Sequence, residues 1–149
     1  MVNNETITGG AVVFRDNRGK RQWLIVKHND ESDWEIPKIT ARRGESSVRS
    51  VLRMTTEQGG MTTRVLEEAG RGNATLTVGP KTIHQRLYYY LLVQKAGGVD
   101  ILGFSDYEWQ EFPKAVRKLS LKKEKQIFKD AKGVLKEWEK KHKVKKVRS

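Results

Sequence analysis

The sequence predicts an α/β domain in which helices cover a mixed β-sheet. Residues 7–15 and 22–27 are rich in β-formers, and the polar residues 16–19 between them suit a hairpin turn. A helical pattern follows in the middle of the chain, further strand-like runs come after it, and a second helical pattern follows them. Strands and helices in this order are typical of a layered α/β fold with a mixed sheet.

The first helix is expected at about residues 46–58. Ser46 or Ser47 can cap its start, because a serine hydroxyl accepts a hydrogen bond from an unpaired N–H of the first turn. Gly59 and Gly60 suit a left-handed C-terminal cap. Apolar side chains recur between the caps at helical spacing (Val48, Val51, Leu52).

Three further strands are expected at residues 61–67, 74–78 and 83–93, of which the last is long and aromatic. Ser120 can cap a final helix at about residues 120–141, beyond which the apolar period is not sustained and the chain is expected to fray. The stripe of this helix is expected to pack on the core. It consists of Ile127, Phe128, Ala131, Val134, Leu135 and Trp138.

A chain of 149 residues suits one domain, expected at residues 1–141 and followed by a basic tail at 142–149. It contains no cysteine, which excludes disulfides and thiolate metal sites. The start resembles no signal peptide, and no apolar run approaches the roughly 20 residues that cross a bilayer. These features predict a cytoplasmic protein without a membrane partner.

The formal net charge is +12, and half of this excess comes from residues 132–149. Such an excess favours polyanionic partners such as nucleic acid, although a solvated tail that aids solubility is the alternative. The basic residues assigned to nucleic-acid contact in the tail are Lys141, Lys143, Lys145, Lys146 and Arg148.

The most specific pattern lies in residues 34–61. It reads W-E-I-P-K, then G-E, a helix, and R-x-x-x-E-x-x-G, and a strand that carries Gly9 and Gly10 precedes it. This order resembles the Nudix hydrolase superfamily over nearly the whole chain. The resemblance implies an α/β/α layered sandwich with a mixed central sheet. It also implies cleavage of nucleoside diphosphates linked to another moiety, with Mg²⁺ or Mn²⁺ held by glutamates of the first helix.

The Nudix box can be laid on the chain position by position. Glu45, Arg53 and Gly60 match it, whereas Ile39 stands where the box has its first glycine. A side chain at this position removes the backbone freedom and close ligand approach that glycine permits. The framework of the box is therefore retained while its phosphate loop is altered.

The three helix positions that carry carboxylates in the family hold Met54, Glu57 and Gln58. Their spacing of three and four residues places them on one helical face. A thioether is a poor ligand for Mg²⁺, and an amide oxygen brings no charge, so the affinity for Mg²⁺ is expected to be low. Glu45, Glu57 and Gln58 remain the candidate metal ligands. Glu57 could instead pair with Arg53 on the next turn.

Glu57 and Glu108 are the candidate catalytic residues, because the resemblance implies an additional loop acid near Glu108. A second group could hold phosphate without a metal, through cationic donors and, at Tyr88, a ring that can stack a base. The candidates for phosphate and nucleotide binding are Lys38, Arg42, Arg43, Arg53, Lys81, Arg86 and Tyr88.

A second alignment places the end of the box at residues 64–70, with Glu67 and Glu68 as metal ligands. It requires an insertion of about ten residues and leaves too little chain for the next strand. The segment is also rich in β-branched residues, which favour a strand. The first alignment is therefore preferred.

Three functions follow as hypotheses. A Nudix-fold protein with a degraded metal site could bind the phosphates of nucleotides or RNA with little or no hydrolysis. Alternatively, a Mg²⁺-dependent Nudix hydrolase could cleave a nucleoside diphosphate-linked or dinucleoside polyphosphate substrate through Glu57, Glu45 and Glu108. A scaffold domain without a ligand is the third. The net charge favours the first, and the overall resemblance favours the second.

Overall fold

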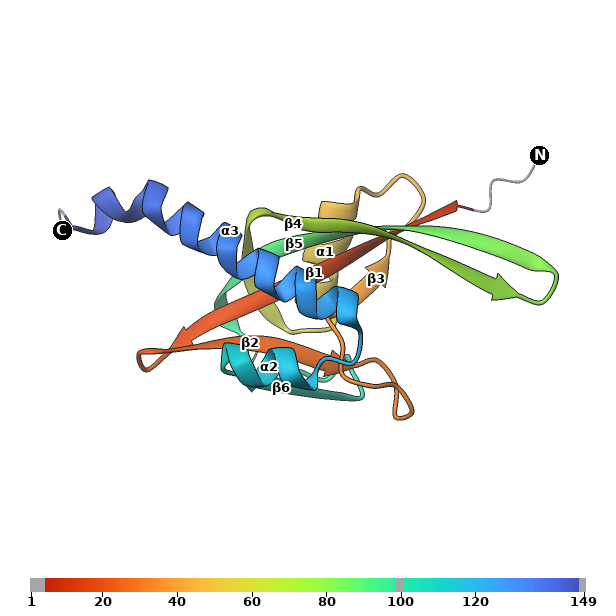
Figure 1. Cartoon of the computed structure of the whole chain (residues 1–149), viewed down its shortest axis with the longest axis horizontal. Coiled ribbons are helices and arrows are strands. Elements are labelled where there is room, and N and C mark those ends of the chain that lie inside the picture. The colour runs from red at the N-terminus through yellow and green to blue at the C-terminus, as the bar shows by residue number, and fades with distance from the viewer. Residues whose placement is uncertain (1–4, 99–100, 148–149) are drawn as a thin grey trace.

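The computed structural model describes residues 5–98 and 101–147, with side chains described as far as residue 142. Figure 1 shows a twisted sheet crossed by a long helix. The elements in chain order are β1 (Glu5–Asn17), β2 (Lys20–Lys27), β3 (Lys38–Thr40), α1 (Ser47–Glu57), β4 (Met61–Val78), β5 (Lys81–Gly97), β6 (Asp106–Gln110), α2 (Phe112–Lys118) and α3 (Lys122–Val147).

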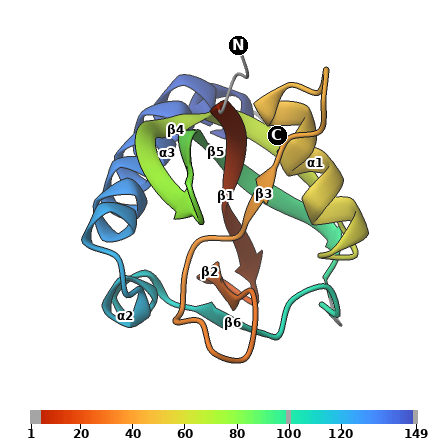
Figure 2. The same ribbon diagram turned by 90° about the vertical axis from the view of Figure 1, so that its right-hand side faces the viewer.

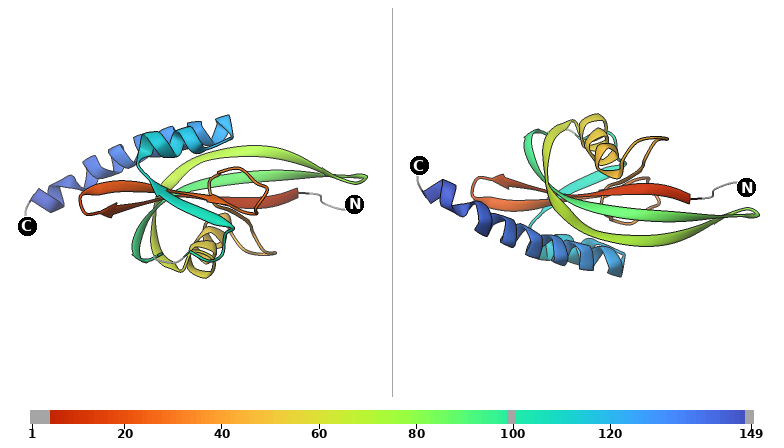
Figure 3. Two further views of the ribbon diagram at one scale, coloured as in Figure 1. Left: turned by 90° about the horizontal axis from the view of Figure 1, so that it is seen from below. Right: turned by 90° about the horizontal axis from the view of Figure 1, so that it is seen from above.

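The sheet is mixed and has the strand order β4-β5-β1-β2-β6, while β3 pairs with β1. Only the pairing of β1 with β5 is parallel among the strand pairs of the described chain. Seen edge-on in Figure 3, α1 covers one face of the sheet, and α2 and α3 cover the other. Figure 2 gives the same layers from the end of the molecule. The predicted α/β/α layered sandwich is confirmed.

The hairpin between β1 and β2 closes through two residues with positive φ. Arg18 has a φ of 52° and Gly19 a φ of 80°. A two-residue turn with both residues in the left-handed region matches the right-handed twist of the strands that flank it. The predicted hairpin is therefore present, and its turn is the tightest common kind.

Gly9 and Gly10 leave room on opposite faces of β1, for helix α1 on one face and for the ring of Tyr89, from the neighbouring strand β5, on the other. A Cβ on Gly9 would lie 2.6 Å from Cγ2 of Val51 and 2.8 Å from the carbonyl oxygen of Ser47, both in α1. A Cβ on Gly10 would lie 2.5 Å from the ring of Tyr89. Neither space admits a side chain without a shift of its neighbour.

The first helix lies where its caps predict. The hydroxyl of Ser46 accepts a hydrogen bond from the N–H of Arg49, and Gly60 has a φ of 59° after the last turn. Residues 64–70, by contrast, lie within β4. The second alignment of the Nudix box, which needs a helix there, is therefore wrong.

The strands after α1 are longer than predicted. In place of three short strands, β4 and β5 form one continuous hairpin with irregularities near Thr63, Glu67 and Gly70. The polar stretch inside β4 stays in the sheet because pairing with β5 satisfies the backbone N–H and C=O groups that face β5, whatever the side chains are. The outer part of this hairpin, residues 73–86, projects beyond the body (Figure 1) and is called the arm below.

The final helix also differs from its prediction. It runs from Lys122 to Val147 rather than over residues 120–141, and the short helix α2 precedes it. The hydroxyl of Ser120 contacts the carbonyl oxygen of Trp34 at 3.4 Å and does not cap α3. Four of the tail residues that are predicted to contact nucleic acid lie outside the described side chains, namely Lys143, Lys145, Lys146 and Arg148.

Two apolar clusters hold the layers together. One packs α2 and α3 on the sheet through residues such as Trp23, Leu91 and Phe128, and includes the predicted stripe of α3. The other packs α1 on the opposite face through residues such as Val13 and Leu92. Among the described helices, none combines the length and apolar character that crossing a membrane requires.

Candidate functional site

The helix position that carries the first family carboxylate is part of the core. Met54 is only 1% exposed and packs in the cluster between α1 and the sheet. Its neighbours there include Val13, Leu24 and Leu92. Because its thioether points into this apolar environment, Met54 fills space and does not face a ligand.

The other two positions that carry carboxylates in the family, Glu57 and Gln58, lie in different environments. Glu57 is exposed at the last turn of α1. The side-chain amide of Gln58 donates to the carbonyl oxygen of Gly103 at 3.2 Å. Its Oε1 is buried and has no hydrogen-bond partner among the described residues. A Cβ on Gly103 would lie 2.4 Å from Gln58, so this contact requires glycine.

Glu45 is fully engaged by its neighbours. Arg53 donates to both of its carboxylate oxygens, at 2.9 and 3.0 Å, and the N–H of Arg42 donates to one of them at 2.9 Å. These hydrogen bonds, first the one from Arg53, lower the pKa of Glu45 from 4.5 to about 2. Arg53 thus pairs with Glu45, and Glu57 makes no ion pair within 4.0 Å in the described part of the chain.

The Glu45–Arg53 pair predicts a measurable acid sensitivity. The pKa of Glu45 is lower in the folded state, so its contribution to stability is present above pH 4.5 and is lost as the pH falls toward 2. We expect the melting temperature of Glu45→Gln to be lower than that of the wild type at pH 6. The two values should approach each other near pH 2 in a calorimetric series. A difference in melting temperature that stays the same at every pH would contradict a stabilising pair of Glu45 with Arg53.

Glu108 lies on the other side of the sheet from α1. In the pairing of β2 with β6 it stands opposite Ile25, which belongs to the cluster beneath α2 and α3. Burial raises the pKa of Glu108, but hydrogen bonds from Lys118 at 2.6 Å and Gln110 at 2.8 Å outweigh it, so the net shift is downward. The sheet therefore separates Glu108 from Glu57.

These residues do not fit a Mg²⁺ or Mn²⁺ site. Such ions prefer several oxygen ligands that converge, with carboxylates to balance their charge. Met54 is buried in an apolar cluster, and both oxygens of Glu45 are occupied. No group of three or more His, Cys, Asp or Glu side chains is close enough to hold a metal within residues 5–98 and 101–142.

Lys38 is held in a buried network that sequence reasoning missed. Its ammonium group contacts Glu124 at 2.6 Å, Glu35 at 2.7 Å and the carbonyl oxygen of Ile36 at 3.0 Å. All three N–H donors of the lysine are thereby used. Glu124, in the first turn of α3, is only 1% exposed and also accepts from the N–H of Ile36 and the hydroxyl of Tyr89.

The same network defines the protonation of two neighbours. Burial raises the pKa of Tyr89, and the carboxylate of Glu124 raises it further, so the phenol stays protonated as a donor. Burial also lowers the pKa of His28, whose Nε2 accepts from the N–H of Lys38 at 3.1 Å. A ring nitrogen that accepts carries no proton, so His28 is neutral. Lys38 therefore has a structural role in this network.

The remaining predicted cations do not gather at one site. Arg42 and Arg43 are exposed in the loop before α1 and make no ion pair within 4.0 Å among the residues described. Lys81 is exposed at the tip of the arm. Lys141 of α3 lines a separate pocket, together with Glu67 of β4. No described pocket brings these four residues together.

Arg86 and Tyr88, however, meet in one pocket at the base of the arm. The pocket has a volume of about 460 Å³. The guanidinium of Arg71 lies 5.1 Å from the ring centroid of Tyr88, and Glu68 also pairs with Arg71 at 3.0 Å. Lys123 reaches the pocket across Gly72, where a Cβ would lie 2.3 Å from its ammonium nitrogen. The lining residues are Arg71, Gly72, Asn73, Arg86, Leu87, Tyr88 and Lys123.

We call this the arm pocket. Sequence reasoning found two of its members but missed Arg71 and Lys123, which come from β4 and α3. Arg86 is also paired with Glu5 at 3.1 Å, on an exposed part of the sheet. With three cations, one aromatic ring and an amide side chain at Asn73, the pocket can bind an anion that carries a planar group.

Comparison with known proteins gives a clear answer for the fold. No family model matches the sequence, and no curated protein matches it. Among solved structures, an Ap4A hydrolase of C. elegans in a binary complex is similar, with a TM-score of 0.71, 18% identity, and coverage of 87% of this chain and 97% of that one.

Two further structures agree. A NUDIX hydrolase from Nitrosomonas europaea has a TM-score of 0.68 at 16% identity, and the match covers 87% of this chain and 89% of that one. The NUDIX domain of Shewanella oneidensis NrtR, complexed with ADP ribose, has a TM-score of 0.66 at 18% identity, with 90% of each chain covered. From its layers, its strand order and these neighbours, the chain has the fold of the Nudix hydrolase superfamily.

Proposed function

We propose that this protein binds the phosphates of nucleotides or RNA, with little or no hydrolysis. The observation that carries the proposal is the arm pocket, which is lined by Arg71, Arg86, Lys123 and Tyr88, with the guanidinium of Arg71 over the ring of Tyr88. The altered metal positions support it, because Met54 is part of the core and Glu45 is neutralised by Arg53.

The chemistry of the arm pocket suits a nucleotide. Guanidinium groups donate two parallel hydrogen bonds to a phosphate, and an ammonium adds a point charge. A tyrosine ring offers a face on which a base can stack. Such binding needs no metal ion to neutralise the phosphate. It should therefore persist in a chelator and weaken as salt rises.

A binding titration tests the proposal. We expect a fluorescent adenosine diphosphate to bind equally well with Mg²⁺ or with EDTA. The double variant Arg86→Gln/Lys123→Gln should weaken binding about tenfold or more, because hydrogen bonds to charged groups contribute roughly 1.5–3 kcal/mol each. The control Arg49→Gln/Lys95→Gln removes the same charge from exposed positions on α1 and β5 and should bind as the wild type does.

The hydrolase alternative gives the opposite result in a turnover screen. Its support is the likeness to structures such as the Ap4A hydrolase of C. elegans, together with the exposed carboxylate of Glu57. Release of phosphate or nucleoside monophosphate from a panel of dinucleoside polyphosphates and nucleoside diphosphate derivatives, with Mg²⁺ or Mn²⁺, would overturn binding without hydrolysis. Loss of that turnover in Glu57→Gln would then assign the activity to α1.

A further inference from the structure

Six lysines of α3 form a row on one flank of the helix. At 100° per residue they fall within a sector of about 80° that lies beside the apolar stripe. Only Lys140 has a carboxylate within 4.0 Å among the residues described, at 3.5 Å from Glu137. The row consists of Lys122, Lys125, Lys129, Lys132, Lys136 and Lys140.

The two flanks of α3 differ sharply in charge. Asp130 and Glu137 lie toward the opposite flank, where Lys123 and Lys141 also lie, so that side is close to neutral. No acid falls inside the sector of the lysine row. Glu139 borders the sector, but its carboxylate accepts two hydrogen bonds from Arg21, at 3.0 and 3.3 Å. The positive charge of α3 is therefore concentrated on one side.

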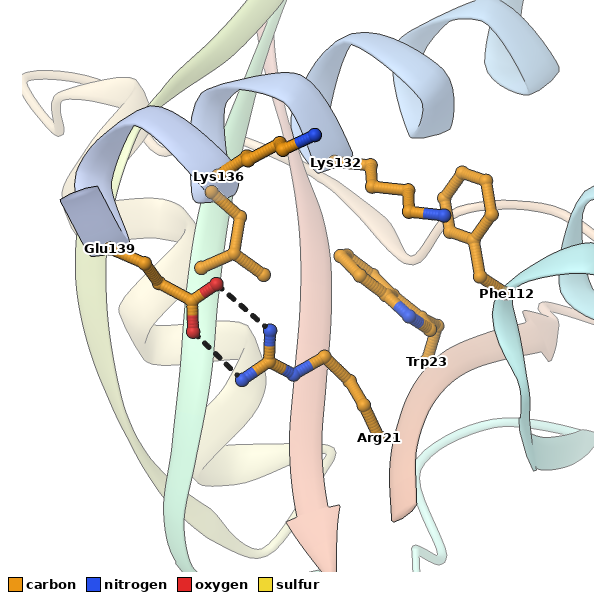
Figure 4. Close-up of a pocket in the computed structure, with 7 residues that line it drawn as sticks. Arg21, Trp23, Phe112, Lys132, Lys136 and Glu139 are labelled. Carbon is orange, nitrogen blue, oxygen red and sulfur yellow. Dashed lines mark hydrogen bonds and ion pairs between the residues drawn. The ribbon is translucent and has the colours of Figure 1, made fainter. Parts of the chain in front are cut away.

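A pocket of about 320 Å³ opens in the middle of the row (Figure 4). Lys132 and Lys136 line it from α3, Lys132 extends toward Phe112, and Phe112 forms part of the wall. The ammonium nitrogen of Lys132 lies 4.5 Å from the centroid of the Phe112 ring. Trp23 lies behind, with its centroid 5.4 Å from that of Phe112. One partly exposed aromatic ring, that of Phe112, thus lies beside the cations of this flank.

Arg21 at the edge of the pocket has a structural role. It is held between Asp16 and Glu139, and the hydrogen bond to Asp16, with that to Glu139, raises its pKa. These contacts tie the β1–β2 hairpin to α3 and neutralise the guanidinium. The lysines Lys132 and Lys136, which have no carboxylate within 4.0 Å in the described part of the molecule, supply the unpaired charge.

We infer that this flank of α3 binds single-stranded nucleic acid, with phosphates along the lysine row and one base in the pocket beside Phe112. The inference rests on the proposed function for its ligand class but concerns a different surface from the arm pocket. A row of cations beside an aromatic ring is how single strands are bound without sequence preference. A duplex presents the same phosphates but keeps its bases stacked inside.

The row also predicts a dependence on strand length. From Lys122 to Lys140 the helix rises about 27 Å, at 1.5 Å per residue. A mononucleotide can cover only one or two of these lysines, whereas a longer strand covers them all. Affinity should therefore increase with the length of an oligouridylate until the row is filled, and each phosphate contact should add to the salt dependence.

The experiment compares two charge-matched variants of the full chain. Fluorescence anisotropy with a labelled oligouridylate of about twelve nucleotides is recorded over a salt series. Lys129→Gln/Lys136→Gln should reduce the slope of log affinity against log salt by about 0.7 per lysine. The control Arg49→Gln/Lys95→Gln should leave the slope unchanged. Equal slopes for the two variants would overturn the inference.

Two further measurements separate this surface from its alternatives. Phe112→Leu, checked for folding by circular dichroism, should weaken single-strand binding and leave the salt slope intact. Duplex RNA that binds as tightly as the single strand would refute the assignment of a base to the pocket. The adenosine diphosphate titration isolates the arm pocket. The lysine-row variant should bind adenosine diphosphate as the wild type does. Absence of adenosine diphosphate binding by the wild type would count against the proposed function alone.

Discussion

Met54→Glu, which places a carboxylate where the Nudix family has one, will destabilise the protein and will not create a metal site. Met54 is 1% exposed within an apolar cluster that includes Val13, Leu92 and Ile101. A charge buried without a partner costs on the order of 3 to 5 kcal/mol of unfolding free energy. Urea denaturation followed by circular dichroism will measure this loss.

The pH dependence of the same variant identifies the cause. Burial raises the pKa of an introduced carboxyl in the folded state, so the folded protein binds its proton more tightly than the unfolded chain does. The deficit relative to the wild type should therefore shrink as the pH falls from the raised pKa of the folded state toward about 4.3, and should stay constant below that pH, where both states are protonated. Met54→Leu, which keeps volume and apolar character, should cost less than about 1.5 kcal/mol. A stabilising effect of Mg²⁺ on Met54→Glu would contradict this account.

Lys38→Met will cause the second large loss of stability. The ammonium of Lys38 lies between the carboxylates of Glu124 and Glu35, at 2.6 and 2.7 Å. Removing it leaves Glu124, which is 1% exposed, without its cation. Breaking a buried ion pair by removal of one partner costs about 3–5 kcal/mol. Chemical denaturation monitored by tryptophan fluorescence will test the prediction.

A double-mutant cycle supplies the control for Lys38. Glu124→Gln keeps a carbonyl oxygen for the N–H of Ile36 while it removes the charge. Lys38→Met/Glu124→Gln should therefore be more stable than the sum of the two single changes predicts, because no buried charge is left alone. Strict additivity would show that the two side chains are not coupled. A mild effect of Lys38→Met alone would indicate that Glu124 is reached by solvent.

Local signals in the sequence predicted much of the fold. The caps at Ser46 and Gly60 bound the first helix as expected, because a cap depends only on residues within a few positions. The continuity of β4 was not predicted, because residues 68–73, between two expected strands, are mostly polar or glycine and only pairing with β5 keeps them in a strand. The start of α3 was misplaced by two residues, since Ser120 bonds to Trp34 instead.

The candidate site shows the same division. Arg86 and Tyr88 share a strand and could be found together, whereas Arg71 and Lys123 join them only through the pairing of β4 and the docking of α3. Glu124 carried a weak signal, an acid in the first turn of a helix, which ordinarily indicates a favourable contact with the helix dipole. Nothing in its neighbours points to Lys38.

The sequence by itself determined the first hairpin and the position of helix α1, because spacing, capping and residue type are local properties. Only the tertiary structure decided what the remaining residues do. Lys38 and Glu124 are 86 positions apart and meet because α3 packs over the sheet. The lysine row gained its pocket because α2 brings Phe112 beside α3. Contacts of this kind depend on strand order and helix docking, which no short stretch of sequence contains.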